Sequence, residues 1–541
     1  MMFRIKLGIT VLIFSFALYT QAQKVNIDGQ FTELVWQNAV SYSGFKTYKP
    51  DIGLDESEKT TVLVTNDSLN IYFAILCYDS APEKIMANLT SRDNIKNDDS
   101  FAIEMDLDGS ANSNIFFKIN PLGIQEDGVI FFDEEEDLNP DKVWYSKGII
   151  TNNGYQVEIA IPFQSLRFKW DTEVEIKMGF KRKIYRKSEI LVYPEYKDET
   201  SNRLMQRETL AFSNIQKQKV LEIIPSVTYT YDRLLENAEW NTEQNRIQAG
   251  ITGKIGLTSD LVLDVTYNPD FSQIEGDAGQ VDVNLRNSLC FPEKRPFFQE
   301  GVELFQFGTQ AWWDMPFTHL VHTRNIIDPL YGVKFTGKLG SKYSLASIVS
   351  TDEFNDDHDH YQIFRLRRNF KDDNYIGVIY TGKENTNAYN RIGGFDGIIR
   401  LSGKSSMEYY FFKSFSDDTL NFKSGNSFGA VYKYKDKIHF LRIGYSQIDK
   451  DFETQIGYLE RGGLQIIPIS YSAIFPVKSN WLNNAGVIFH TRKKRDLYSE
   501  KHEHSTNIGV QLNFNNDSWI QIGRRFSSEI FQNKSFNTNA F

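Results

Sequence analysis

Two glutamates near the middle of the chain have the side chains that a glycoside hydrolase requires. Glu293 and Glu300 lie close together in the sequence, and such an enzyme uses one carboxyl group as acid and one as base or nucleophile. However, Lys294 and Arg295 follow Glu293 directly, and a nearby cation lowers a carboxyl pKa, which suits a salt bridge better than a general acid. Nearby prolines and the pair Phe297–Phe298 favour a segment that folds inward with its charges paired. We therefore expect no catalytic residue, and Glu293 and Glu300 are the candidates if the chain is an enzyme.

Several polar tracts have residue types that bind metal ions. The tract 356–360 reads Asp-Asp-His-Asp-His, and His502 and His504 lie near the C-terminus, but each is expected to be a solvated loop. The acidic runs Asp98–Asp99 and 133–137 leave calcium open as a ligand, because calcium takes several oxygen ligands. They lack the fixed spacing of an EF-hand loop, and no His-Glu-x-x-His motif occurs. We expect no resident cofactor.

Length and composition limit the class of protein that can position these residues. The chain has 541 residues, more than the roughly 250–300 at which single cores stop growing, so at least two domains are expected. It has 60 basic and 70 acidic residues, and without a basic excess a nucleic-acid partner is excluded. The only cysteines, Cys77 and Cys290, are far apart, so no disulfide framework is expected.

The first residues have the layout of a secretory signal peptide, which we assign to 1–22. Arg4 and Lys6 precede an apolar run, 7–19, that is shorter than the roughly 20 residues a spanning helix needs. No later stretch resembles a membrane helix. A mature protein that enters a membrane must then do so as a closed barrel, because only helices and barrels satisfy their backbone groups in lipid. The expected location is the outer membrane of a Gram-negative bacterium.

Residues 23–215 read as short strands separated by turns, which favours a β-sandwich. Pieces of this region resemble family nine carbohydrate-binding modules, in the order 27–29 with 34–36, 69–74, 97–108, 120–123 and 155–163. The resemblance implies a module that grips sugar rings between aromatic faces, with polar side chains holding the hydroxyls. A polysaccharide or oligosaccharide is therefore an expected partner.

The sugar-binding positions of that family carry over only in part. The first aromatic platform corresponds to Lys96, which is not aromatic, and the second to Tyr193, with Tyr196 close by. The polar position after the Asp-Gly turn corresponds to Lys118. Trp144 is expected either in the core or as an exposed platform. The alternative is a sandwich kept as a structural or protein-contacting module.

Residues 216–541 show a different pattern, in which apolar and polar residues alternate over about ten-residue segments joined by polar turns. Such segments are typical of outer-membrane barrels, and their number predicts roughly 14–16 antiparallel strands with lipid on the outside. The alternation breaks near 268–302, where an inward segment is expected. A soluble sandwich or propeller is the alternative, but no repeat of roughly 40–50 residues is present.

The stretches 268–277 and 291–301 closely resemble the hallmark of a bacterial outer-membrane family of unknown function. That family joins a family-nine-like sandwich to a membrane barrel and is often labelled a membrane-associated hydrolase, without a settled activity. Residues 391–394 and 454–458 resemble its later positions. The last residues, 537–541, lack the preceding alternation, so we expect a barrel that is truncated or incomplete.

Three functions follow from these expectations. The leading hypothesis is an outer-membrane carbohydrate-binding protein that takes part in glycan binding or uptake. The second is a non-enzymatic porin-like or structural barrel. The third is a membrane-associated hydrolase that acts on O-glycosyl bonds in carbohydrate catabolism.

Overall fold

The computed structural model describes most of the chain beyond the first residues. It describes residues 25–540 except 108, 110, 112, 132–135, 139, 167, 169–172, 198–201, 217–220, 237–238, 259–260, 270–289, 292, 309–316, 341, 353–357, 371–373, 419–420, 460, 478, 480, 515–517 and 532–533. The expected signal peptide lies outside these residues. None of the helices within them has the length and apolarity needed to cross a membrane.

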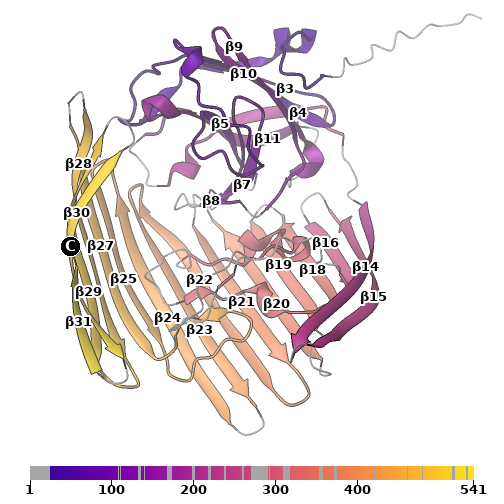
Figure 1. Cartoon of the computed structure of the whole chain (residues 1–541), viewed down its shortest axis with the longest axis vertical. Helices are drawn as coiled ribbons and strands as arrows, with labels where there is room; N and C mark the ends of the chain where they lie inside the picture. Colours follow the sequence, from indigo (N-terminus) through magenta and orange to yellow (C-terminus); the bar gives the residue numbers. More distant parts are fainter. Residues whose placement is uncertain are drawn as a thin grey trace, which may run out of the picture.

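The N-terminal part consists of two antiparallel sheets packed face to face (Figure 1). The first sheet has the order β1 (Val40–Ser43), β3 (Thr60–Asn66), β4 (Asn70–Tyr78), β10 (Gly154–Pro162) and β9 (Tyr145–Thr151). The second has the order β2 (Lys46–Lys49), β12 (Glu189–Tyr193), β11 (Glu173–Ile184), β5 (Ser100–Asp106), β6 (Ser113–Ile119), β7 (Gln125–Phe131) and β8 (Glu136–Asp137), and β13 (Glu208–Ser213) also pairs with β11. Short 3-10 helices connect the strands: η1 (Leu34–Asn38), η2 (Pro82–Lys84), η3 (Phe163–Ser165), η4 (Tyr185–Lys187) and η5 (Arg203–Met205).

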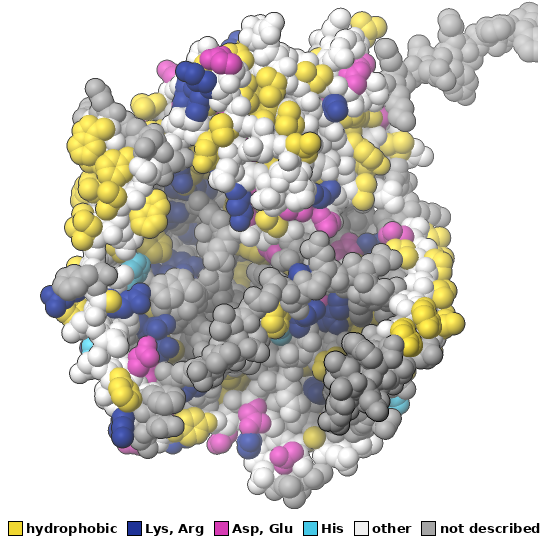
Figure 2. All heavy atoms as spheres, in the orientation of Figure 1, with side chains coloured by type: hydrophobic (Ala, Val, Ile, Leu, Met, Phe, Trp, Pro, Cys, Tyr) yellow, Lys and Arg dark blue, Asp and Glu magenta, His cyan; other side chains and the backbone are white. Residues whose placement is uncertain are grey.

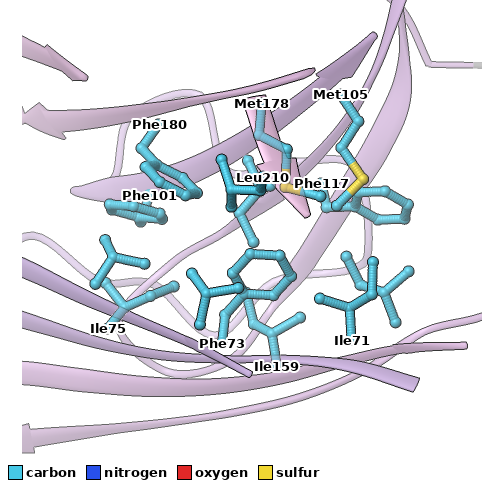
Figure 3. Packing of buried hydrophobic residues seen from close by; sticks show 14 of the residues in the cluster. Ile71, Phe73, Ile75, Phe101, Met105, Phe117, Ile159, Met178, Phe180 and Leu210 are labelled. Atoms are coloured by element: carbon cyan, nitrogen blue, oxygen red, sulfur yellow. The ribbon is translucent and has the colours of Figure 1, made fainter. Parts of the chain in front are cut away.

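Alternating apolar residues build the core between these sheets. Every second residue of a strand points to the same face, so Phe73 of β4 faces the other sheet together with Ile71 and Ile75. Phe101 of β5 and Phe180 of β11 meet it from the opposite side, with ring centroids 6.2 Å apart from each other (Figure 3). All three side chains are buried. The two inner faces therefore close one dry core, as the sequence predicts.

The remaining strands form one long antiparallel sheet of 16 strands among the described residues, and this confirms the predicted all-β class. The sheet curls around a hollow that Figure 1 shows from its open side, with the sandwich over one end. In order, its strands are β14 (Leu221–Glu236), β15 (Glu239–Gly256), β16 (Leu261–Tyr267), β18 (Pro329–Leu339), β19 (Tyr343–Asp352), β20 (Asp359–Asn369), β21 (Tyr375–Glu384), β22 (Tyr389–Ser402), β23 (Ser405–Asp417), β24 (Phe422–Lys435), β25 (His439–Ile448), β27 (Leu464–Pro476), β28 (Leu482–Asp496), β29 (His502–Phe514), β30 (Trp519–Phe531) and β31 (Lys534–Ala540). In the described part of the chain no backbone pairing joins β14 to β31, so the curled wall has two free edges.

The two faces of this wall differ in chemistry. Val378 on β21 and Val487 on β28 are each 48% exposed on the outer face. Along each strand, the residues that alternate with the outward ones point inward. Arg365 of β20, Asp396 of β22 and Glu408 of β23 are inward residues of this kind, and all three are buried charges. An apolar outside around a polar inside is the pattern of a barrel in lipid, and it is the reverse of a soluble protein.

Chain between the strands fills part of the hollow. It contains α1 (Pro296–Gln299), η6 (Val302–Phe305), β17 (Phe317–His319) and η7 (Thr323–Asn325), and β17 pairs with β26 (Tyr458–Leu459). We call the described residues 290–308 and 317–327 the inward segment. Phe298 packs on Ile348 and Ile363 of β19 and β20 in one buried cluster, and Phe307 packs in a second cluster along β21–β25. The predicted stretch 268–302 lies partly outside the described residues, and the chain that enters the hollow continues past its end.

Candidate functional site

Glu293 is the centre of a closed hydrogen-bond network in the inward segment. Its carboxylate accepts hydrogen bonds from Arg295 Nε at 2.8 Å and Nη2 at 2.7 Å, and from the hydroxyl of Thr323 at 2.6 Å. Arg295 also donates to the main-chain oxygens of Ile326 and Thr323, both at 2.6 Å. Burial raises the pKa of Glu293. The hydrogen bonds and charge of Arg295, together with the hydrogen bond from Thr323, lower this pKa by more than burial raises it, so the net direction is down. A carboxylate held in this state is a structural anion and a poor general acid.

Glu300 is paired as well, and its partner belongs to the wall. Lys254 of β15 lies with its Nζ 2.6 Å from Glu300 Oε2. Lys334 of β18 donates to the main-chain oxygens of Phe297 and Glu300, and it pairs with Asp264 of β16 at 3.3 Å. The Glu300 side chain thus ties the inward segment to the wall, whereas Glu293 pairs within the segment, and both fit the charge-paired interpretation of this stretch.

A second buried network joins the inward segment to a nearby part of the wall, on β20 and β22. Arg365 of β20 forms a two-pronged ion pair with Asp396 of β22, and the Tyr375 hydroxyl donates to the same carboxylate at 2.8 Å. Arg365 also donates to the main-chain oxygen of Gln306 at 3.2 Å. Gly377 faces this guanidinium, and a Cβ built there would lie 2.7 Å from Arg365 Nη1. Only glycine leaves the space that the arginine occupies.

The inner face of β28–β30 carries a cavity of about 480 Å³. Figure 2 shows basic side chains along the hollow between the sandwich and the wall. The residues that line this cavity are polar or charged with one apolar exception: Ile488, His490, Thr491, Arg492, Lys494, Glu503, His504, Ser505, Asn507, Gln521, Arg525, Ser527, Ser528 and Glu529. Sequence reasoning missed this site, although the alternation in these strands places most of its residues on one face; Thr491, His504 and Ser528 are the exceptions.

Of the two alternatives expected for Trp144, the structure shows the buried one: this side chain lies in the sandwich core, which rules out an exposed platform. Only 4% of the residue is exposed, and its ring meets Phe117 edge-on with centroids 5.4 Å apart. Its indole N–H donates to Asp127 Oδ1 at 3.1 Å. A sugar ring cannot stack on a face that the core already covers.

The other family-nine positions lie on or near the second sheet, and most are already engaged. Lys118 pairs with Glu126 at 2.5 Å and with Glu136 at 2.9 Å. Burial raises the pKa of Glu136, but Lys118, Lys181 and Lys96 lower it, with a net direction down. Lys118 therefore forms ion pairs with two acidic side chains, and the charge of Lys96 also acts on Glu136.

The two tyrosines predicted to contact sugar are packed against protein. Tyr193 is partly buried, and its ring lies 5.8 Å from Phe45 and 6.3 Å from Phe180. Tyr196 is 9% exposed and meets Tyr48 edge-on at 5.4 Å, while its hydroxyl accepts a hydrogen bond from Arg207 at 3.1 Å. Neither ring forms one side of an open aromatic clamp in this conformation.

The acidic and histidine tracts serve local structure. Asp98 accepts hydrogen bonds from Asn88 and Asn120, and Asp99 accepts them from the amides of Met86 and Tyr185. Residues 133–135 and 356–357 of the two tracts lie outside the described residues. Within the residues that the structure describes, no group of three or more His, Cys, Asp or Glu side chains is arranged to hold a metal ion.

Two histidines of these tracts, His360 and His504, bond to hydroxyl groups. His360 Nδ1 lies 2.8 Å from Thr351 Oγ1, and His504 Nδ1 lies 2.7 Å from Ser528 Oγ. His502 lies exposed at the start of β29. His360, His502 and His504 therefore lie on strands of the wall, and His358 directly precedes β20.

Residues 425–429 spell Gly-Asn-Ser-Phe-Gly, a match to the serine-hydrolase pattern Gly-x-Ser-x-Gly. That chemistry needs the serine on a sharp turn between a strand and a helix. Ser427 instead lies within β24 and is fully buried. This sequence match therefore does not indicate a hydrolase site.

Comparison with known proteins gives one family match and several distant structural likenesses. Residues 220–310 match the model of a family described as a domain of unknown function (DUF5916). The matched part spans β14–β16 and the start of the inward segment, the region where the sequence resembles an uncharacterised outer-membrane family. The likeness of the sandwich to family-nine modules stays a prediction. No curated protein matches the chain.

Several solved structures are similar to this chain, and three of them compare with it as follows in identity, coverage and TM-score. OccAB3 of Acinetobacter baumannii is 9% identical with a TM-score of 0.27, covering 82% of this chain and 92% of that one. OccK11 (OpdR) of Pseudomonas aeruginosa is 9% identical with a TM-score of 0.29, covering 84% and 100%. OprD of the same organism is 9% identical with a TM-score of 0.29, covering 84% and 94%. Scores this low carry no argument, so the architecture rests on the strand pairing itself.

Proposed function

We propose that this chain is an outer-membrane protein of a Gram-negative bacterium that takes part in the binding or uptake of glycans through a polar lumen. Residues 1–22 serve as its export signal in this proposal. The observation that carries it is the division of the 16-stranded wall into an apolar outer face and a charged inner face. An apolar outer face and a charged inner face are both favourable only where lipid surrounds the wall and water fills the space inside it.

The inward segment favours a solute binder over a passive porin. Two sets of contacts hold this segment against the wall: Lys254 pairs with Glu300, and Arg365, which is paired with Asp396, donates to the main-chain oxygen of Gln306. Its phenylalanines add buried apolar contacts with β19–β25. A lumen occupied in this way admits solutes selectively, because they pass only beside the segment or after it moves.

Two features support a sugar ligand. The cavity on β28–β30 offers hydroxyl, amide and charged groups in a volume of about 480 Å³, within the roughly 300–1,000 Å³ of small-molecule sites. The order of sequence pieces in the sandwich resembles sugar-binding modules. The sandwich side chains named above would need to rearrange before binding a ring, so the proposal assigns first contact to the lumen.

Planar-bilayer recording of the purified full chain tests the lumen. The proposal predicts a small or closed conductance that a soluble oligosaccharide changes, because the inward segment narrows the passage. A large, steady conductance that sugars leave unchanged would instead favour the passive porin.

Polysaccharide assays test the ligand and the hydrolase alternative. Retention of the full chain on affinity gels is expected for at least one polysaccharide, and no retention on any would end the glycan part of the proposal. We expect no hydrolysis, because Glu293 and Glu300 are both ion-paired. Activity that disappears in Glu293→Gln or Glu300→Gln would establish the hydrolase instead.

A further inference from the structure

The cavity on β28–β30 is built from rows of side chains that cross neighbouring strands. His490 of β28 pairs in register with Asn507 of β29, which pairs with Arg525 of β30. Directly opposite residues in antiparallel strands point to the same face. The next row is Arg492, Ser505 and Ser527. All six side chains line the same cavity.

Lysine and arginine outnumber carboxylates in the lining of this cavity by three to two. Arg492, Lys494 and Arg525 line it, against the carboxylates of Glu503 and Glu529. Glu503 accepts a hydrogen bond from the main-chain amide of Ile530 at 3.1 Å, and Arg461, which pairs closely with Asp496 just outside the lining, also reaches Glu503 at 3.9 Å. The net charge of the whole chain is −10, so a cationic cavity runs against the overall balance.

The surroundings of the cavity leave it open to solutes. The inward segment packs on β19–β25 in the two buried clusters, whereas neither cluster includes a residue of β28–β30 among the described residues. Arg525, Glu529 and Gln521 are exposed. The polar inner face of β28–β30 therefore lies on the part of the wall that those clusters leave uncovered.

We infer that this cavity is a binding site for an acidic oligosaccharide, a sugar chain that carries carboxylate groups. A guanidinium binds a carboxylate through two parallel charge-assisted hydrogen bonds, and Arg492 and Arg525 lie in adjacent rows. The serine hydroxyls and the amides of Asn507 and Gln521 supply partners for sugar hydroxyls. The inference rests on the proposed function and names the class of its substrate.

The test compares two sugars that differ only at C6, which is a carboxylate in one and a hydroxymethyl group in the other. Full-length protein in detergent is titrated by calorimetry with the trisaccharide of galacturonic acid and with the uncharged trisaccharide of galactose of the same linkage. The acidic sugar is expected to bind about tenfold more tightly, because one charge-assisted contact is worth about that factor. Equal affinity for the two sugars, or no binding of either, overturns the inference.

Adjacent arginines on β30 provide a matched pair of variants. Arg525→Gln removes an inward guanidinium and is expected to abolish the preference for the acidic sugar. Arg524→Gln is the control, because Arg524 pairs with the outward Ile508 and stacks over Phe526 at 4.8 Å. A preference kept in Arg525→Gln, or lost equally in both variants, contradicts the site. If Arg525→Gln loses its heat-modifiable gel mobility, Arg492→Gln takes its place with the same expectation. Since binding is measured in detergent, its failure stays separate from failure of the conductance test.

Discussion

Arg365 and Asp396 form a buried ion pair on neighbouring parts of the wall, with Arg365 Nη2 2.8 Å from Asp396 Oδ2. The arginine is 1% exposed and the aspartate fully buried. The same guanidinium holds the main-chain oxygen of Gln306 in the inward segment at 3.2 Å. One side chain therefore satisfies a buried charge and anchors the chain that narrows the lumen.

Replacing Arg365 by alanine is expected to destabilise the protein strongly. The change leaves the Asp396 carboxylate buried without its cation, a situation that costs about 3–5 kcal/mol. The unfolding temperature read from heat-dependent gel mobility should fall. Arg368→Ala is the control, because Arg368 lies exposed on the outer face of the same strand, where truncation costs within about 0.5 kcal/mol. Equal shifts in the two variants would refute the role of the pair.

Phe298→Ala is expected to loosen the inward segment. Phe298 is 1% exposed and packs with Ile348 and Ile363, and truncating such a ring costs about 3–5 kcal/mol. The inward segment contributes no strand to the 16-stranded wall. Losing this contact should therefore raise the single-channel conductance more than it destabilises the wall. Phe364→Ala, which truncates a ring 41% exposed on the outer face of β20, should leave the conductance unchanged. No difference between these variants would mean that the segment does not limit the passage.

The general architecture was predictable because strand periodicity is a local signal. Alternation such as Ile508, Val510 and Leu512 fixes which face of β29 meets lipid, and it needs no knowledge of distant residues. The break after Tyr267 likewise marked where the chain leaves the wall. Turn spacing then sets the order of neighbours, since each strand pairs mainly with the next.

Partners far apart in sequence were not predictable from local patterns. The pairing of Glu300 with Lys254, and of Arg365 with Gln306, depends on where the inward segment docks. Trp144 was ambiguous because a short apolar neighbourhood does not say whether another strand covers it. The cavity on β28–β30 escaped notice because its residues reach one site only through the register of three strands.

A charge on the outer face should impair assembly in lipid. Val378 is 48% exposed on β21, and an arginine facing the bilayer midplane costs about 2–4 kcal/mol. The folded fraction of Val378→Arg in liposomes, read from heat-dependent gel mobility, should fall well below that of the parent. Gln511→Arg introduces the same side chain at an inward position that lines up with Gln521 and should fold normally. If Gln511→Arg had the lower folded fraction and Val378→Arg folded normally, lipid would lie on the other face of the wall.

The N-terminal segment of the sandwich should loosen as pH rises. Glu158 is fully buried and accepts hydrogen bonds from the amides of Asp28 and Gly29 and from the indole of Trp36. Burial raises the pKa of Glu158 to about 7, although the two amide bonds lower it. Between its ordinary value of 4.5 and about 7, the folded state binds more protons than the unfolded one, so stability falls with rising pH.

Hydrogen exchange of residues 25–38 checks this dependence. After correction for intrinsic rates, protection should be lower at about pH 8 than at about pH 5. Glu158→Gln, which cannot ionise, should show weaker protection that no longer changes with pH. Rising protection at high pH in the parent protein would contradict the assignment.

The central claim is that the 16-stranded wall lies in a membrane with its apolar face toward lipid. Fractionation of cells that produce the full chain, followed by gels of heated and unheated samples, tests it most directly. We predict recovery in the outer-membrane fraction, extraction only by detergent, and a change of gel mobility on heating. Recovery of a compact monomer from the periplasm without detergent would contradict the claim.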